Sequence, residues 1–285
     1  MAAFEIRPRR ATELVDASFQ LLRRFYPQLV TVSAVAMAPG VFARIALREQ
    51  LGDPTAMVAH PYTSASVVLL GLLCFAVAEA VLVVATSQGY LEGTVDLPRA
   101  LAAGWRRLGT VIAAIALHYL ASFGLFFAVI VGVGVVVALL AKSTSGVAGL
   151  LFLFVPLGTW LAMYVGLRTF AVANAVLLDN LGPIAAFRRT WVLSKDCAAH
   201  IFFSLALAYL LYFIIAIIAV IIGTKLFNPA LTQILSSLMI IPVYPLLAVV
   251  STLLYYDLRI RKEGFDLEMM SRDLGAGAPA PIPAM

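Results

Sequence analysis

Long apolar stretches dominate this chain and leave little choice of fold. A helix needs roughly 20 apolar residues to cross the hydrocarbon core of a bilayer, and six segments meet that requirement. They are residues 28–47, 66–88, 108–141, 147–179, 198–227 and 231–257. Only 12% of the residues are charged, about half the share found in soluble domains. The sequence therefore predicts an all-α, polytopic integral membrane protein with six transmembrane helices, and it excludes a soluble fold.

Lysine and arginine are distributed unevenly about the six spans. Fifteen of the 20 basic residues lie before spans one, three and five or after span six. Four lie in the opposite loops, and Arg168 lies inside a span. Because basic residues concentrate in the cytoplasmic loops of membrane proteins, we expect both termini in the cytoplasm. The chain would lie in a plasma membrane, such as a bacterial inner membrane, with Lys142 on the opposite side.

The segments expected outside the membrane are short. A six-span domain would occupy residues 1–258, followed by a cytoplasmic juxtamembrane segment at 259–273 and a tail at 274–285. The tail is rich in Pro, Ala and Gly, a composition typical of disordered ends. No further folded domain is expected.

The chain shows an internal period of 86 residues. A similar amphipathic segment with arginines precedes spans one, three and five, and its aromatic residues Phe19, Trp105 and Trp191 are each 86 residues apart. Agreement of hydropathy, charge and period predicts three tandem two-span units. Their bounds would be about 11–96, 97–182 and 183–268. Chance similarity among six ordinary spans is the alternative.

Each unit would open with an amphipathic elbow helix in the cytoplasmic interface. The three elbows are expected near residues 11–25, 96–107 and 183–195. Their side chains would contact membrane lipids, above all anionic headgroups, at about 1 kcal/mol per basic residue. The expected contact residues are Arg23, Arg24, Arg106, Arg107, Arg188, Arg189, Trp191 and Lys195. Docking of a soluble or membrane protein partner is the alternative, and no basic patch typical of nucleic-acid binding is present.

Three segments are similar to parts of one known family. Residues 177–196, LLDNLGPIAAFRRTWVLSKD, place an acidic residue before Gly-Pro, followed by an alanine, basic residues, a small hydroxyl residue and an aromatic residue. Residues 11–26, ATELVDASFQLLRRFY, and 252–268, TLLYYDLRIRKEGFDLE, are similar to the family's start and end. The chain thus resembles the membrane-domain family of glycerophosphoryl diester phosphodiesterases. It departs from the family pattern at Asp179, where a glutamate is expected, and at Thr190, where a serine is expected.

The resemblance implies a membrane module of unassigned role. Phosphodiesterase activity in the named enzymes belongs to a separate soluble barrel. The His-Arg-Gly start of that barrel is absent here, because Pro, Tyr and Ile follow His60, His118 and His200. The sequence also shows no G-x-S-x-G, H-E-x-x-H, P-loop or G-x-G-x-x-G motif, which are signatures of soluble-type active sites. We expect no catalytic residue, no metal site and no cofactor.

Three ionisable residues lie deep inside the predicted spans. Glu79, His118 and Arg168 are nine to eleven residues from the cytoplasmic ends of spans two, three and four. At about 1.5 Å per residue they would lie at similar depth, where charges are costly, face the bundle interior and tend to pair. We predict an intramembrane cluster in which Glu79 pairs with Arg168 and His118 is hydrogen-bonded nearby. The cluster is either a structural tie or a proton or substrate site.

Two functions from different classes fit these features. The first is a non-catalytic scaffold, partner-binding or lipid-binding membrane module, which the basic elbows and the missing catalytic motifs favour. The second is a small-solute or proton-coupled transporter that uses the Glu79, His118 and Arg168 cluster. An intramembrane enzyme ranks last, because no nucleophile with an adjacent base is recognisable.

Overall fold

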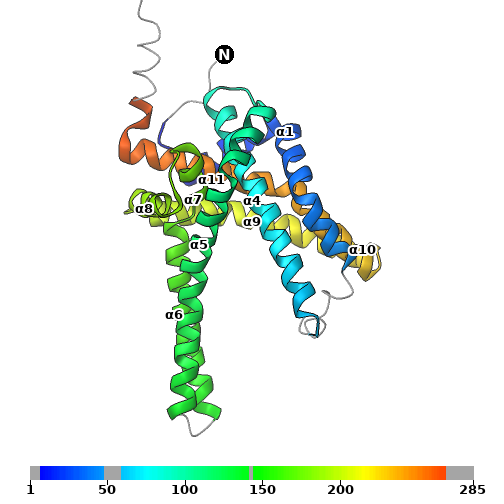
Figure 1. Ribbon diagram of the computed structural model, residues 1–285, viewed down its shortest axis with the longest axis vertical. Helices are drawn as coiled ribbons and strands as arrows, with labels where there is room; N and C mark the ends of the chain where they lie inside the picture. The colour runs from blue at the N-terminus through cyan, green and yellow to red at the C-terminus, as the bar shows by residue number, and fades with distance from the viewer. Residues whose placement is uncertain (1–6, 48–58, 141–143, 268–285) are drawn as a thin grey trace, which may run out of the picture.

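The computed structural model describes residues 7–47, 59–140 and 144–267, and this part is helical throughout apart from short connections (Figure 1). The helices are α1 (Ala11–Ala46), α4 (Pro61–Leu91), α5 (Leu97–Leu140), α6 (Thr144–Arg168), α7 (Val172–Leu178), α8 (Pro183–Leu193), α9 (Ala198–Leu226), α10 (Pro229–Leu238) and α11 (Ile240–Glu263). Six spans are long and apolar enough to cross a membrane: α1, α4, α5, α6 with α7, α9, and α10 with α11. The chain is an all-α, polytopic membrane protein, as predicted. Lys142 and the tail at 274–285 lie outside the described residues.

The basic segments of the sequence meet at one end of the helix bundle. Hydrogen bonds and ion pairs join the segments before spans one, three and five to one another and to the end of span six. These pairs are Arg9 with Asp257, Arg24 with Gly93, Arg107 with Asn180 and Arg189 with Glu263. We name this end, residues 7–24, 93–107, 179–196 and 257–263, the basic end and the opposite one the far end. Two spans separate each of these segments from the next, so the chain returns to the same end after every pair of spans.

The best-packed part of the core lies in the half of the bundle near the basic end. Helices α1, α4 and α11 pack against one another there, and the side chains of Leu14, Leu82 and Tyr255 are fully buried. Helix α5 approaches α4 so closely that a Cβ atom added at Gly104 would lie 3.0 Å from the carbonyl oxygen of Ala80. Small residues at helix contacts permit such packing in membrane proteins. The core therefore holds the basic ends of the spans in place.

Towards the far end the helices separate. Figure 1 shows the α5–α6 hairpin projecting away from the splayed ends of α1 and α4. Helix α6 packs extensively against α5 but only sparsely against α9. Large apolar side chains such as Phe127 on α5, Trp160 on α6 and Phe213 on α9 are more than half exposed there. Surfaces of this kind suit lipid hydrocarbon rather than water.

Two of the three predicted elbow helices are separated from the following span by a break. Helix α1 is interrupted at Phe25 (φ −114°, ψ 19°). Helix α9 follows α8 after Cys197 (φ −112°, ψ 11°), two 86-residue periods beyond Phe25. Helix α5 instead runs unbroken from Leu97 to Leu140 through the equivalent residue, Val111. The second elbow is therefore the first turns of a long helix, which corrects the prediction of a separate element.

Equivalent positions of the predicted units share their burial. Leu14, Ala100 and Ala186 are 1%, 0% and 0% exposed, whereas the aromatic residues Phe19 and Trp105 are exposed and the third, Trp191, is partly buried. The same face of each elbow is thus buried. The division into three units stays a prediction that this pattern supports.

The fourth span is interrupted between α6 and α7, at residues 169–171. The N–H of Val172 donates to the carbonyl oxygen of Thr169 at 3.3 Å, so the backbone forms a tight turn in place of an α-helical one. The hydroxyl of Ser194 donates to the carbonyl oxygen of Arg168 at 3.0 Å and satisfies a group freed by the break. Irregular backbone at membrane depth is tolerated where protein covers it or where it borders a cavity.

Candidate functional site

A cavity of about 570 Å³ lies where the broken span meets its neighbours. Helices α4, α5, α6, α7, α9 and α11 form its wall, and most of the lining side chains are aliphatic or aromatic. We name it the central cavity. The polar side chains that line it are Glu79, His118, Tyr119, Tyr209, Tyr212, Tyr244 and Ser251. Its volume and its mixture of apolar walls with a few polar groups are typical of small-molecule sites.

Glu79 reaches the cavity from α4 and contacts α11. The hydroxyl of Tyr244 donates a hydrogen bond to the Glu79 carboxylate. The Tyr244 ring packs edge-on against Phe75, one turn before Glu79, with ring centres 5.3 Å apart. Within the described part of the chain, Glu79 forms no ion pair with a basic side chain. The predicted salt bridge between Glu79 and Arg168 is therefore wrong, and Tyr244 is the partner of Glu79.

His118 reaches the same cavity from α5 and contacts the break in the fourth span. Its Nδ1 lies 2.7 Å from the hydroxyl oxygen of Thr169, and that hydroxyl donates to the carbonyl oxygen of Val165 at 2.8 Å. A hydroxyl has one hydrogen, so Thr169 must accept from the Nδ1–H of His118. The neutral ring then presents Nε2 as a hydrogen-bond acceptor. Glu79 and His118 thus share a cavity, as the predicted cluster required, although each has its own partner.

Arg168 does not line the cavity. Its guanidinium donates to the carbonyl oxygen of Trp191 at 2.6 Å and lies over the Trp191 ring, 4.7 Å from the ring centre. It also lies 5.8 Å from the ring centre of Tyr164. Arg168 is the last residue of α6, where the helix dipole favours a positive charge. This buried cation therefore joins the end of α6 to α8, and Glu79 has no basic partner among the residues that the structure describes.

The prediction wrongly places Arg168 in the cluster because it does not foresee the break in the fourth span. The depth estimate treats residues 147–179 as one continuous helix, in which Arg168 would lie near the level of Glu79. The turn at 169–171 interrupts that helix and places Arg168 against Trp191 and Ser194 at the basic end. Thr169, the next residue, still contacts His118, so depth counted along the sequence places Arg168 near His118 but does not give the direction of its side chain.

Several residues predicted to contact headgroups also form contacts inside the protein. Arg189 donates to Asp179 at 2.9 Å and to Glu263 at 2.8 Å. Burial alone would lower the pKa of Arg189, but these hydrogen bonds outweigh it and raise the pKa above its ordinary value. Arg24 donates to Gly93 and Arg107 to Asn180, and Trp191 stacks on Phe187 besides holding Arg168. Arg189 is thus an internal cross-link, and its predicted contact with headgroups stays a prediction.

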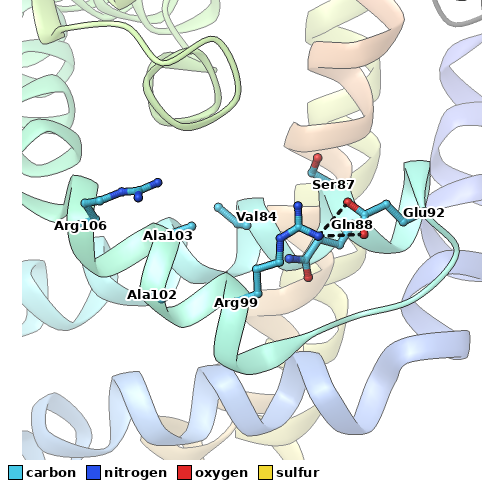
Figure 2. Close-up of a pocket in the computed structure, with 8 residues that line it drawn as sticks. All are labelled: Val84, Ser87, Gln88, Glu92, Arg99, Ala102, Ala103 and Arg106. Carbon is cyan, nitrogen blue, oxygen red and sulfur yellow. Dashed lines mark hydrogen bonds and ion pairs between the residues drawn. The ribbon is translucent and has the colours of Figure 1, made fainter. Parts of the chain in front are cut away.

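The remaining predicted contacts are exposed at the basic end. Arg23, Arg106, Arg188 and Lys195 have no side-chain partner among the residues that the structure describes. Arg106 borders a shallow pocket of about 410 Å³ between α4 and α5. Figure 2 shows Arg99 turned toward Glu92, 3.4 Å away, while Arg106 extends over the pocket apart from that pair. A role of these four residues in binding headgroups stays a prediction.

A second buried carboxylate, Asp257, was not among the predicted site residues. Its Oδ1 accepts from the backbone N–H of Arg9 at 2.7 Å. Its Oδ2 contacts His200 Nε2 at 2.9 Å and Arg261 Nε at 2.7 Å. The cluster joins the N-terminal segment, α9 and α11 at the basic end. The basic residue four positions after Asp257 in the sequence was the available signal, since such pairs face each other on a helix.

No group of three or more His, Cys, Asp or Glu that could hold a metal ion occurs in the described ranges. Comparison of the chain with models of protein families, with curated proteins and with solved structures finds no match. The function is therefore inferred from the central cavity and its surroundings.

Proposed function

We propose that this protein is a non-catalytic membrane module that binds a lipid-like amphiphile in the central cavity, with its basic end in the cytoplasm. The observation that carries the proposal is the chemistry of the cavity wall, which is mainly apolar but holds a carboxylate, an imidazole and several phenols. A ligand with a long apolar part and one polar end matches such a wall. Burial of the apolar part supplies binding free energy, and the polar groups orient the ligand.

The cavity is accessible from the hydrocarbon region. Met163 of α6 and Phe202 and Tyr209 of α9 line it and are also 45%, 38% and 47% exposed. These residues lie within apolar spans, and the adjacent side chains Phe203 and Leu210 on α9 are exposed and apolar. Since α6 packs only sparsely against α9, an apolar chain can enter between these helices without crossing water.

The basic end supports the orientation. Arg23, Arg106, Arg188 and Lys195 are exposed there, and positive charges next to a membrane are attracted to the anionic headgroups of the cytoplasmic leaflet. The bias of lysine and arginine among the loops favours the same side. The resemblance to the phosphodiesterase membrane-domain family supports a role as a membrane module.

A small-solute transporter has less support. That alternative relied on Glu79, His118 and Arg168 acting as one site. Arg168 instead contacts Trp191 and does not line the central cavity. A hydrophilic solute would also meet a mainly apolar wall, where each unsatisfied polar group is costly. The separation of Arg168 from Glu79 therefore favours an amphiphile.

The test is to fill the cavity with a larger side chain. Ala206 lines the cavity from α9, whereas Leu210, one turn later, is 55% exposed and does not line it. Wild type, A206W and L210W are reconstituted in nanodiscs of mixed phospholipids, and retained lipid is counted by native mass spectrometry after release. We expect wild type and L210W to retain a stoichiometric amphiphile and A206W to lose it. Equal retention by A206W, or none by wild type, would overturn the proposal.

A further inference from the structure

We propose that the polar end of the bound amphiphile is a protonated amine, held by the Glu79 carboxylate and the Nε2 atom of His118. This inference rests on the proposed function and names the chemical class of its ligand. The ammonium group would take the place of a basic side chain beside Glu79. The apolar part of the ligand would lie between α6 and α9.

The central cavity has more hydrogen-bond acceptors than donors. An ionised carboxylate accepts about four hydrogen bonds, yet Tyr244 is the one donor to Glu79 within the described part of the chain. His118 adds the acceptor Nε2, because Thr169 occupies its Nδ1–H. An ammonium group has three N–H donors and no acceptor. Its hydrogen-bonding capacity is therefore complementary to that of the cavity.

The charge of the cavity favours the same ligand. No lysine or arginine among the described residues lines it, and Arg168, the basic residue predicted beside Glu79, is held by Trp191. A buried carboxylate in hydrocarbon is costly unless it is paired or carries a proton. An ammonium ligand would neutralise the Glu79 charge, whereas a phosphate or carboxylate headgroup would add a second negative charge beside it.

The aromatic lining adds a third source of selectivity. Tyr119, Tyr209 and Tyr212 line the cavity with Glu79, and the ring of Tyr119 lies 5.2 Å from that of His118. Faces of such rings attract cations, most strongly where water is excluded. Aromatic faces, free acceptors and the missing basic partner together distinguish this site from the basic end.

The test compares headgroups on one apolar chain. Dodecylamine, dodecanol and dodecanoate are added to the full-length protein in nanodiscs of zwitterionic lipid, empty nanodiscs correct for partitioning, and occupancy is read by native mass spectrometry. Hydrogen bonds to charged groups contribute about 1.5–3 kcal/mol, which corresponds to a preference for dodecylamine over dodecanol of about tenfold or more. Binding of dodecanol or dodecanoate as tight as that of dodecylamine would overturn the inference while leaving the proposed function intact. Binding of none of the three would overturn the proposed function itself.

Three variants test which residues determine the preference for dodecylamine. E79Q keeps an acceptor for Tyr244 but removes the charge, so dodecylamine and dodecanol should bind about equally, with dodecanol binding unchanged. H118N keeps a donor near Thr169 and removes the Nε2 acceptor, so the preference for the amine should fall by several-fold. E92Q, at the pocket of Figure 2, should bind like wild type. An unchanged preference in E79Q would contradict the inference. If E79Q failed to fold, the selectivities of wild type and H118N would decide.

Discussion

The basic end and the central cavity each hold a carboxylate, Asp257 buried and Glu79 partly buried, and the two differ in their hydrogen bonds. Asp257 at the basic end is 3% exposed and receives hydrogen bonds from the Arg9 backbone, His200 and Arg261. Glu79 in the cavity has Tyr244 as its one described donor. Buried charges in stable architecture are paired and fully hydrogen-bonded. The difference indicates that Asp257 holds helices together, whereas Glu79 has acceptor capacity that the described side chains do not use, as the proposed amine site requires.

Removing the charge of Asp257 should have the largest effect on stability. D257N leaves the Arg261 guanidinium and the His200 ring beside a neutral side chain, and breaking a buried ion pair costs about 3–5 kcal/mol. We expect the low end of that range, about 3 kcal/mol, because Arg261 is 34% exposed. The free energy of unfolding is measured by denaturant titration in detergent micelles. E92Q, which breaks the exposed Arg99–Glu92 pair, serves as control and should change little. Equal stability of D257N and E92Q would contradict the role of Asp257 in holding the helices together.

A pair of glycine substitutions compares packing in the two regions. In G104A the new Cβ lies 3.0 Å from the Ala80 carbonyl oxygen, and such overpacking costs about 1–3 kcal/mol. In G166A the new Cβ lies beside the cavity, 3.8 Å from Ser122 Oγ, which is an ordinary contact. Both variants gain about 1 kcal/mol of helix propensity. We therefore expect G104A to be less stable than G166A by about 2 kcal/mol, measured by the same titration. G166A as the less stable variant would contradict the difference in packing.

The smallest change in stability is expected for E79Q. The amide oxygen can still accept from Tyr244, and the substitution removes a charge that has no basic partner in the described structure. The free energy of unfolding should stay within about 1 kcal/mol of wild type. A loss as large as that of D257N would show that Glu79 is architectural and would end the comparison.

The fold was predictable because few folds are possible for a chain that spans a lipid bilayer. Hydrocarbon requires every backbone group to be satisfied within a helix or a closed barrel, so hydropathy alone predicts the six spans, and the structure confirms them. The elbows were harder to predict. Helix α5 runs unbroken from the elbow at Leu97 to Leu140 and so begins well before the predicted start of the span at residue 108, because amphipathic and apolar segments can share one helix.

The site was only half predictable. Hydropathy indicates how deep a residue lies but not which way its helix faces, so Glu79 and His118 were expected together while their partners were not. The break that displaces Arg168 lies at Thr169, Phe170 and Ala171, where no proline or glycine marks it. Tyr244 is one of several aromatic residues in span six, and the sequence does not distinguish it as the partner of Glu79. Tertiary contacts with α8 and α5, through Ser194 and His118, accompany this turn, and sequence periodicity does not contain them.

The length of α5 has a consequence for the bilayer itself. The helix has 44 residues, and the part beyond Leu108 alone is roughly 50 Å long at about 1.5 Å per residue. A hydrocarbon core measures about 30 Å. Such hydrophobic mismatch forces the helix to tilt steeply or the surrounding lipid to stretch. Because α5 and α6 form one hairpin that also borders the opening toward α9, the lipids at that opening are the ones whose packing the mismatch disturbs.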